Sequence, residues 1–169
     1  MFLNISLFVI LVICVITDLH NRKIYNAVIF PGILLALVTH LITGGIQPFL
    51  YSVLSCFVGL FILLLPYFMG GMGAGDVKLL ALIGAFKGIS FVVYTAIYMG
   101  IIGGLLSLFV LLFKKGGKQK IKLIFYFLYG LKSGIRIPLN IQKQSFSGTV
   151  PYGVAIAGGV VWNWINGGI

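Results

Sequence analysis

The sequence predicts an all-α, polytopic membrane protein with six transmembrane helices. Of its 169 residues, 60% are hydrophobic and 8% are charged, and the mean hydropathy is +1.16. Soluble domains carry about 25% charged residues, so this composition indicates a chain that lies in lipid. Long apolar runs recur along the sequence, and a helix needs about 20 mostly apolar residues to cross a bilayer.

The first three apolar runs predict helices over residues 2–17, 27–43 and 48–68. The first run is short and N-terminal, as a cleavable signal peptide would be. However, no basic residue precedes it, and its positive charges, Arg22 and Lys23, follow it. We therefore expect a retained helix whose N-terminus lies outside the cell.

The next apolar stretch, residues 76–113, is interrupted at Lys87 and Gly88. We predict a short fourth helix over residues 76–86 and a longer fifth over residues 89–113, although a single tilted helix could also carry one lysine. Lys and Arg favour cytoplasmic loops. With six spans, every lysine and arginine of the chain except Lys87 lies on the cytoplasmic side. If residues 76–113 crossed the membrane only once, the lysines after residue 113 would lie on the opposite side from Arg22 and Lys23, and the charge bias would vanish.

The sixth run, residues 149–165, carries Trp162 and Trp164 where an aromatic belt lies at the membrane exit. Both termini are then outside. Between the fifth and sixth runs lies a basic, aromatic segment, residues 114–148, whose apolar core is too short to cross. We expect it to lie on anionic lipid at the cytoplasmic interface. The whole chain, residues 1–169, then forms a single membrane-embedded domain.

The chain contains only two acidic residues, Asp18 and Asp76. A carboxylate at membrane depth costs roughly 2.5 to 3.5 kcal/mol, which makes each a functional candidate. Asp18 follows the first run and Asp76 begins the fourth, so the predicted topology puts both at the cytoplasmic boundary. Two adjacent carboxylates resist ionising together, which leaves one acid and one base to activate water. Alternatively, each Asp only caps a helix or pairs with a neighbouring lysine.

Glycines precede the second aspartate in the stretch Gly73-Ala74-Gly75-Asp76. Glycine allows close backbone approach and dihedral angles closed to other residues, which suits a site that an extended peptide must reach. The alternatives are a simple turn and ordinary helix packing in a membrane. The pattern gains weight from its place at the start of a predicted helix, with a second Asp at the matching end of an earlier one.

These motifs together resemble the type IV prepilin peptidases, a family of GxGD intramembrane aspartyl proteases. The resemblance covers Asp18 with its basic, polar turn, the stretch Gly73-Ala74-Gly75-Asp76-Val77-Lys78-Leu79, and the start of the last helix at Val150-Pro151-Tyr152-Gly153. One departure is Tyr25, where the family commonly has proline. Cys14 and Cys56 form no CxxC pair, so the chain resembles the short, peptidase-only members such as those of tight-adherence pili, without methyltransferase activity.

The resemblance implies that Asp18 and Asp76 are catalytic, with Gly73, Gly75, Lys78 and Pro151 binding substrate or shaping the site. It also implies a prepilin or pilin-like substrate, cut at the cytoplasmic face of the inner membrane between its basic leader and its apolar helix. Lys78 could instead be an interface lysine that reaches the headgroups.

No His, Cys and carboxylate cluster has metal-ligand spacing, so we expect neither metal nor cofactor. The net charge of +10 favours lipid contact, and nothing else in the sequence points to nucleic acid.

Three other functions stay open. A GxGD protease could act on other membrane substrates, such as signal peptides or archaeal preflagellins. A small transporter or channel would also place acids at helix ends, but it usually shows polar residues along several spans. A structural protein of a secretion or pilus apparatus would tolerate Asn at both Asp positions.

Overall fold

The structure of the protein, a computed structural model, describes residues 2–113 and 152–167. The chain divides into two compact units, residues 1–103 with 151–169, and residues 104–150. The described residues form six helices: α1 (Phe2–Asn21), α2 (Asn26–Gly44), α3 (Ile46–Phe68), α4 (Ala74–Lys87), α5 (Ile89–Phe113) and α7 (Tyr152–Ile165). This confirms the all-α prediction. Pro151 and the predicted interfacial segment, residues 114–148, lie outside the described residues.

The break at Lys87 and Gly88 is present, as predicted. Gly88 has a φ angle of 91°, a conformation that residues with a Cβ rarely adopt. A single continuous helix over residues 76–113 is therefore excluded, and α4 and α5 are separate helices.

Three predicted helix ends were wrong by about one turn or less, and one of them is the start of α3, at Ile46 rather than at residue 48. Helix α1 continues past residue 17 through Asp18 to Asn21, because its backbone hydrogen bonds do not depend on apolar side chains. Helix α4 begins at Ala74, so Asp76 is its third residue rather than its first, and Gly75 lies inside the helix.

Four of the six helices are long and apolar enough to cross a membrane, namely Phe2–Asn21, Asn26–Gly44, Ile46–Phe68 and Ile89–Phe109. Helices α4 and α7 have 14 residues each. At about 1.5 Å per residue each is roughly 21 Å long, shorter than a hydrocarbon core of about 30 Å. Length and composition therefore support four of the six predicted spans, and the other two stay a prediction.

Helix α4 is the core of the first unit. Every residue from Asp76 to Phe86 is buried except Lys78, and α4 packs against α1, α2, α3 and α7. A helix that is apolar on all sides is expected to be enclosed in this way. The surrounding helices hold the acidic residue of α4 away from bulk solvent.

Glycines set the close approach of α3 to α4. A Cβ atom at Gly59 would lie 2.6 Å from the carbonyl oxygen of Leu80, and one at Gly84 would overlap the carbonyl oxygen of Ser55. The Ser52 hydroxyl donates a 2.6 Å hydrogen bond to the carbonyl oxygen of Ala85 in the same interface. Small residues and hydroxyl groups of this kind are typical of helix packing in membranes.

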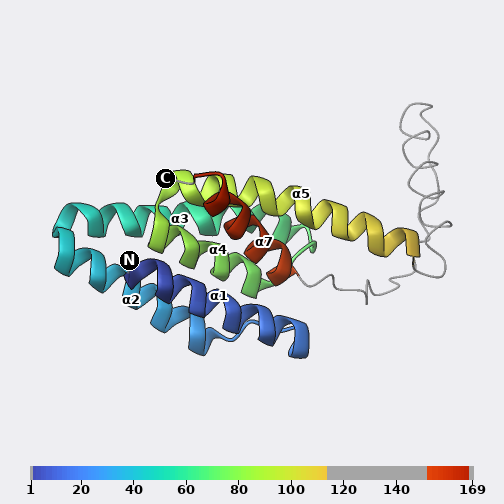
Figure 1. The fold of residues 1–169 in the computed structure, drawn as a ribbon, viewed down its shortest axis with the longest axis horizontal. Coiled ribbons are helices and arrows are strands. Elements are labelled where there is room, and N and C mark those ends of the chain that lie inside the picture. The colour runs from blue at the N-terminus through green and yellow to red at the C-terminus, as the bar shows by residue number, and fades with distance from the viewer. Residues whose placement is uncertain (1, 114–151, 168–169) are drawn as a thin grey trace. The chain divides into compact units, whose positions relative to one another are not determined.

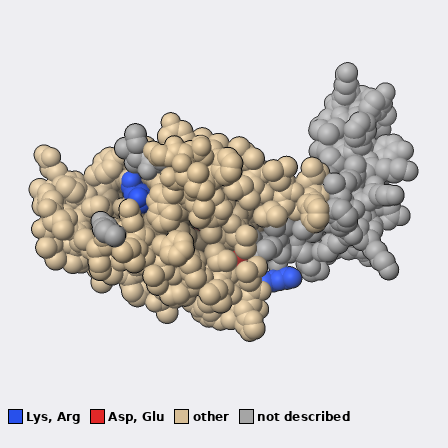
Figure 2. Space-filling view, in the orientation of Figure 1, with Lys and Arg blue, Asp and Glu red and all other residues tan. Residues whose placement is uncertain are grey.

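The outer surface of the helices is apolar. Phe8, Leu34, Leu54, Phe61 and Ile97 are each more than half exposed, and the face seen in Figure 2 carries few charged atoms. Water does not favour so much exposed apolar area on a soluble monomer. Together with the four long apolar helices, this surface supports a membrane protein.

Candidate active site

One end of the first unit brings together four helix ends that are distant in sequence. Figure 1 shows the last turn of α1, the start of α2, the start of α4 and the start of α7 at this end. Helix α1 packs against α2, α4 and α7, and α4 also packs against α7. The two aspartates of the chain lie on α1 and α4 at this end, and not on opposite sides of the bundle.

Asp18 lies in the last turn of α1 and is only 8% exposed. Its carboxylate oxygen Oδ2 accepts a hydrogen bond of 2.9 Å from the backbone N–H of Gly153, in the first turn of α7. The backbone N–H groups at a helix start have no partner within the helix and carry partial positive charge. The start of α7 is therefore a favourable place for a negative charge on Asp18.

Asp76 is the third residue of α4 and is also 8% exposed. Its Oδ2 atom accepts a hydrogen bond of 3.2 Å from the backbone N–H of Gly73, the residue that precedes the helix. A carboxylate at the third helical position commonly caps its own helix in this way. The capping interpretation of Asp76 is thus part of the geometry, and the bond uses only one of its two oxygens.

The two carboxylates have similar surroundings, because each is buried and accepts a hydrogen bond from a backbone N–H at a helix start. Each carboxylate rests at the start of a helix, Asp18 at α7 and Asp76 at α4. These hydrogen bonds engage Oδ2 of each residue and leave Oδ1 of each without a hydrogen bond among the described residues. Two carboxyl groups that lie close enough to interact can share a proton, so that one acts as an acid and the other as a base.

Gly73 and Gly75 were expected to allow both close approach and dihedral angles that other residues cannot adopt. The structure supports close approach at Gly75, but neither glycine has a positive φ angle. Gly73 has a φ angle of −81°, and of the stretch before α4 only Gly70 has a positive φ angle, 75°. A Cβ atom at Gly75 would lie 2.9 Å from Cβ of Ile24. The residue that approaches Gly75 in the structure is thus in the turn between α1 and α2.

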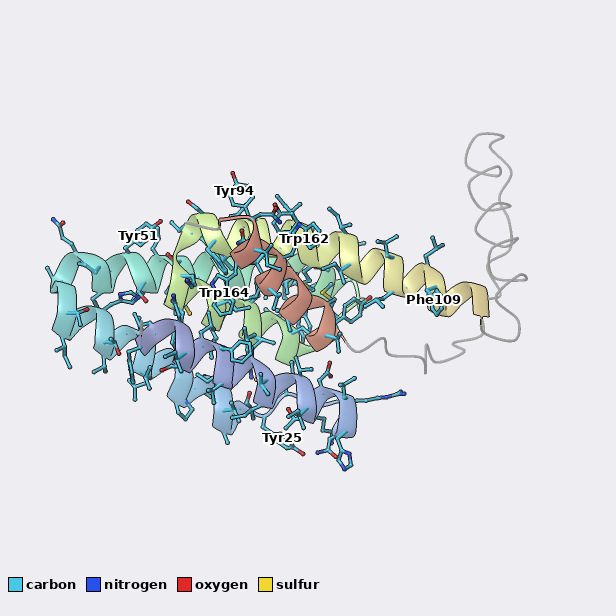
Figure 3. All side chains as sticks on the ribbon, viewed as in Figure 1. Tyr25, Tyr51, Tyr94, Phe109, Trp162 and Trp164 are labelled. Atoms are coloured by element: carbon cyan, nitrogen blue, oxygen red, sulfur yellow. The ribbon has the colours of Figure 1, made fainter. Side chains whose placement is uncertain are left out.

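Further contacts tie that turn to α4. Lys78 Nζ donates a 2.9 Å hydrogen bond to Oδ1 of Asn26 and lies 5.5 Å from the ring centroid of Phe30. Tyr25 precedes α2, and its hydroxyl accepts a 3.1 Å hydrogen bond from the side-chain amide of Asn21 (Figure 3). Lys78, the fifth residue of α4, therefore links α4 to the first turn of α2.

The structure brings together Asp18, Asp76, Gly73, Gly75 and Lys78, whereas Pro151 is not described. It adds Gly153, which the sequence analysis quoted in a motif but did not select as a site residue. The signal was available in part, because a glycine near the start of a helix often marks close approach. Its partner could not be found from sequence, since Gly153 and Asp18 are 135 residues apart.

Among the described residues, no three His, Cys, Asp or Glu side chains gather into a group that could hold a metal ion. The same region has no buried side-chain nitrogen or oxygen without a hydrogen-bond partner. The polar groups at this end of the described residues include the two carboxylates, backbone amides, Lys78 and the side chain of Asn26.

Comparison with protein families gives a match to the type IV leader peptidase family over residues 5–108. The chain belongs to this family. The matched residues include both aspartates and the glycine stretch before Asp76, but not α7. Comparison with curated proteins and with solved structures gave no match. The predicted family is confirmed, and with it the coarser prediction of a membrane peptidase.

Proposed function

We propose that the protein is an intramembrane aspartyl endopeptidase that removes the leader of type IV prepilins or pilin-like precursors. One observation carries the proposal. In a chain of the type IV leader peptidase family, the only two acidic residues, Asp18 and Asp76, are buried at the same end of one helical unit. Family membership supports the peptidase class, and the two carboxylates supply the chemistry.

The proposed reaction is an acid–base hydrolysis. The ionised carboxylate takes a proton from a water molecule, and the water oxygen attacks the scissile carbonyl carbon. The protonated carboxyl donates a hydrogen bond to the carbonyl oxygen and stabilises the charge that develops there. The carboxyl group that took the proton from water then gives it to the leaving amine nitrogen, the tetrahedral intermediate collapses, and the peptide C–N bond breaks. Both carboxyl groups are then in their starting protonation states. No cofactor is needed for this sequence of steps.

The proposed topology places this reaction at the cytoplasmic face of the inner membrane. Six spans, with both termini outside, put Arg22, Lys23 and Lys78 on the cytoplasmic side and Lys87 outside, in keeping with the preference of basic residues for cytoplasmic loops. The two aspartates then meet a precursor where its basic leader joins its apolar helix. Residues 1–169 form one peptidase domain, and its basic segment 114–148 contacts anionic lipid in this account.

Two other functions remain as alternatives. A protease of the same chemistry could cut a different membrane substrate, such as a preflagellin. A non-enzymatic assembly or transport protein would use the aspartates only as helix caps, and the hydrogen bond from Gly73 N–H to Asp76 is compatible with that role. The first alternative differs from the proposal in the peptide that is cut. The second differs because it needs no proton transfer by a carboxyl group.

The test is cleavage by the purified full chain in liposomes. A pilin-like precursor with a basic leader is supplied, and the products are identified by mass spectrometry in the presence and absence of a strong chelator. We expect one cut between leader and apolar helix, unaffected by the chelator and without methylation of the new N-terminus when a methyl donor is added. Cleavage of only unrelated membrane peptides would support the first alternative, and no cleavage of any would support the second.

A further inference from the structure

At the start of helix α7, Gly153 packs directly against the carboxylate of Asp18, and a side chain at residue 153 would not fit. The Gly153 N–H donates its hydrogen bond to Asp18 Oδ2 at 2.9 Å in a buried position. A Cβ atom added to Gly153 would lie 2.6 Å from the same oxygen and 3.1 Å from both Cβ and Cγ of Asp18. Atoms other than hydrogen-bonded pairs do not approach so closely, so the carboxylate and a side chain at residue 153 compete for one place.

We propose that Gly153 is a positioning residue of the active site, one that sets the orientation of the Asp18 carboxylate. This inference rests on the proposed function. The Gly153 amide holds Oδ2, so the carboxylate cannot rotate freely about its Cβ–Cγ bond, and Oδ1 is directed to the water or substrate. Catalysis depends on such placement, because an error of about 1 Å in a reacting group can cost on the order of a hundredfold in rate.

The position also gives Asp18 a favourable place for its charge. Gly153 lies in the first turn of the 14-residue helix α7, where the unpaired backbone N–H groups favour an anion. A hydrogen bond to a charged acceptor is stronger than a neutral one. Gly153 thus supplies a hydrogen-bond donor, its backbone N–H. Because Gly153 has no Cβ atom, this N–H can reach the carboxylate of Asp18.

Helix α7 contains two matched controls. A Cβ atom at Gly158 would lie 3.2 Å from the Cδ1 atom of Ile102, the movable end of a flexible side chain. A Cβ atom at Gly159 would lie 2.9 Å from the carbonyl oxygen of Thr95 and 3.0 Å from the amide nitrogen of Met99, which are backbone atoms of α5. Alanine at residue 158 therefore tests helix propensity together with a small shift of one flexible side chain, and alanine at residue 159 tests disturbed backbone packing away from the aspartates.

The experiment compares Gly153→Ala, Gly158→Ala and Gly159→Ala in the full chain, by cleavage kinetics and by thermal unfolding in detergent. We expect Gly153→Ala to lower kcat by about 10- to 100-fold with KM within about twofold, and to move at least one limb of the rate–pH profile. Gly158→Ala should cleave as the wild type does. Gly159→Ala should lower the unfolding temperature, while its folded fraction keeps its kcat and its pH profile.

A second measurement needs no catalysis. If the added methyl group acts through the carboxylate, Gly153→Ala should lower the unfolding temperature less in an Asp18→Ala background than in the wild type. The Asp18→Ala variant keeps Cβ but lacks Cγ and Oδ2, and Oδ2 is the atom that the methyl group would approach most closely. Equal losses in the two backgrounds would overturn the inference. So would a Gly153→Ala variant with the kcat and pH profile of Gly158→Ala. If the wild type itself cleaves no precursor, the proposed function fails instead, and the unfolding comparison still tests the contact.

Discussion

The two ends of helix α4 hold their charges in different ways. At one end, the carboxylates of Asp76 and Asp18 accept hydrogen bonds from backbone amides of Gly73 and Gly153. At the other end, Lys87 Nζ lies 5.2 Å from the ring centroid of Phe91 and 5.3 Å from that of Trp164. Aromatic faces attract a cation without directing it, whereas an amide fixes one chosen oxygen. In the proposed function the acidic end carries the chemistry, whereas the contacts of Lys87 anchor the other end of α4.

This difference predicts, first, that the acidic end is indispensable for cleavage. Asp18→Asn and Asp76→Asn each keep an oxygen that can accept the backbone N–H bond but lose the exchangeable proton. We expect each to lower the cleavage rate in liposomes by about 10³-fold or more, with little change in membrane insertion or unfolding temperature. Wild-type cleavage by either variant would leave only the capping role for that residue.

Second, the two ends should face opposite sides of the membrane. In a variant without Cys14 and Cys56, a cysteine at residue 87 should react with a membrane-impermeant maleimide added to intact cells. A cysteine at residue 23, beside the aspartates, should react only after the cells are opened. The reverse pattern would place the aspartates on the outer face and contradict the proposed topology.

Third, replacing the lysine at each end of α4 should affect cleavage less than replacing an aspartate does. Lys78 should affect kcat/KM, whereas Lys87 should affect only the unfolding temperature. Lys78→Met removes the hydrogen bond to Asn26, so we expect kcat/KM to fall by about 3- to 10-fold, or roughly 0.7 to 1.4 kcal/mol. Lys87→Met keeps most of the apolar stem but loses the contact with two rings, which is worth about 0.5 to 1 kcal/mol near a surface. It should lower the unfolding temperature slightly and leave kcat/KM unchanged. If Lys78→Met and Lys87→Met lowered kcat/KM equally, the two ends of α4 would not differ in their contribution to cleavage.

Much of the fold could be predicted from the sequence, because apolar runs and helix breakers are local signals. The separation of α4 from α5 followed from Lys87 and Gly88, and the structure confirms it. Helix ends were less predictable. The polar residues after Asp18 end the apolar run but not the backbone hydrogen bonds, so α1 extends to Asn21.

The candidate site could be predicted only in part. The scarcity of acids selected Asp18 and Asp76, and charge asymmetry put both at one membrane boundary. Contacts between distant helices carry no local signal, which is why Gly153 was not selected. The contacts of Trp164 illustrate the same point: its ring centroid lies 6.4 Å from that of Phe91, a neighbour that the sequence did not indicate, whereas Trp162 is 54% exposed (Figure 3). The aromatic belt itself stays a prediction.

The central claim is that the two carboxylates work as one pair on one scissile bond. The most direct test is the rate of precursor cleavage by the wild-type protein as a function of pH, with a substrate that has no ionisable group near the cut. A shared proton predicts a maximum with two limbs, one from loss of the base at low pH and one from loss of the acid at high pH. A rate that changes along one limb only, or that does not depend on pH while the protein stays folded, would contradict the pair.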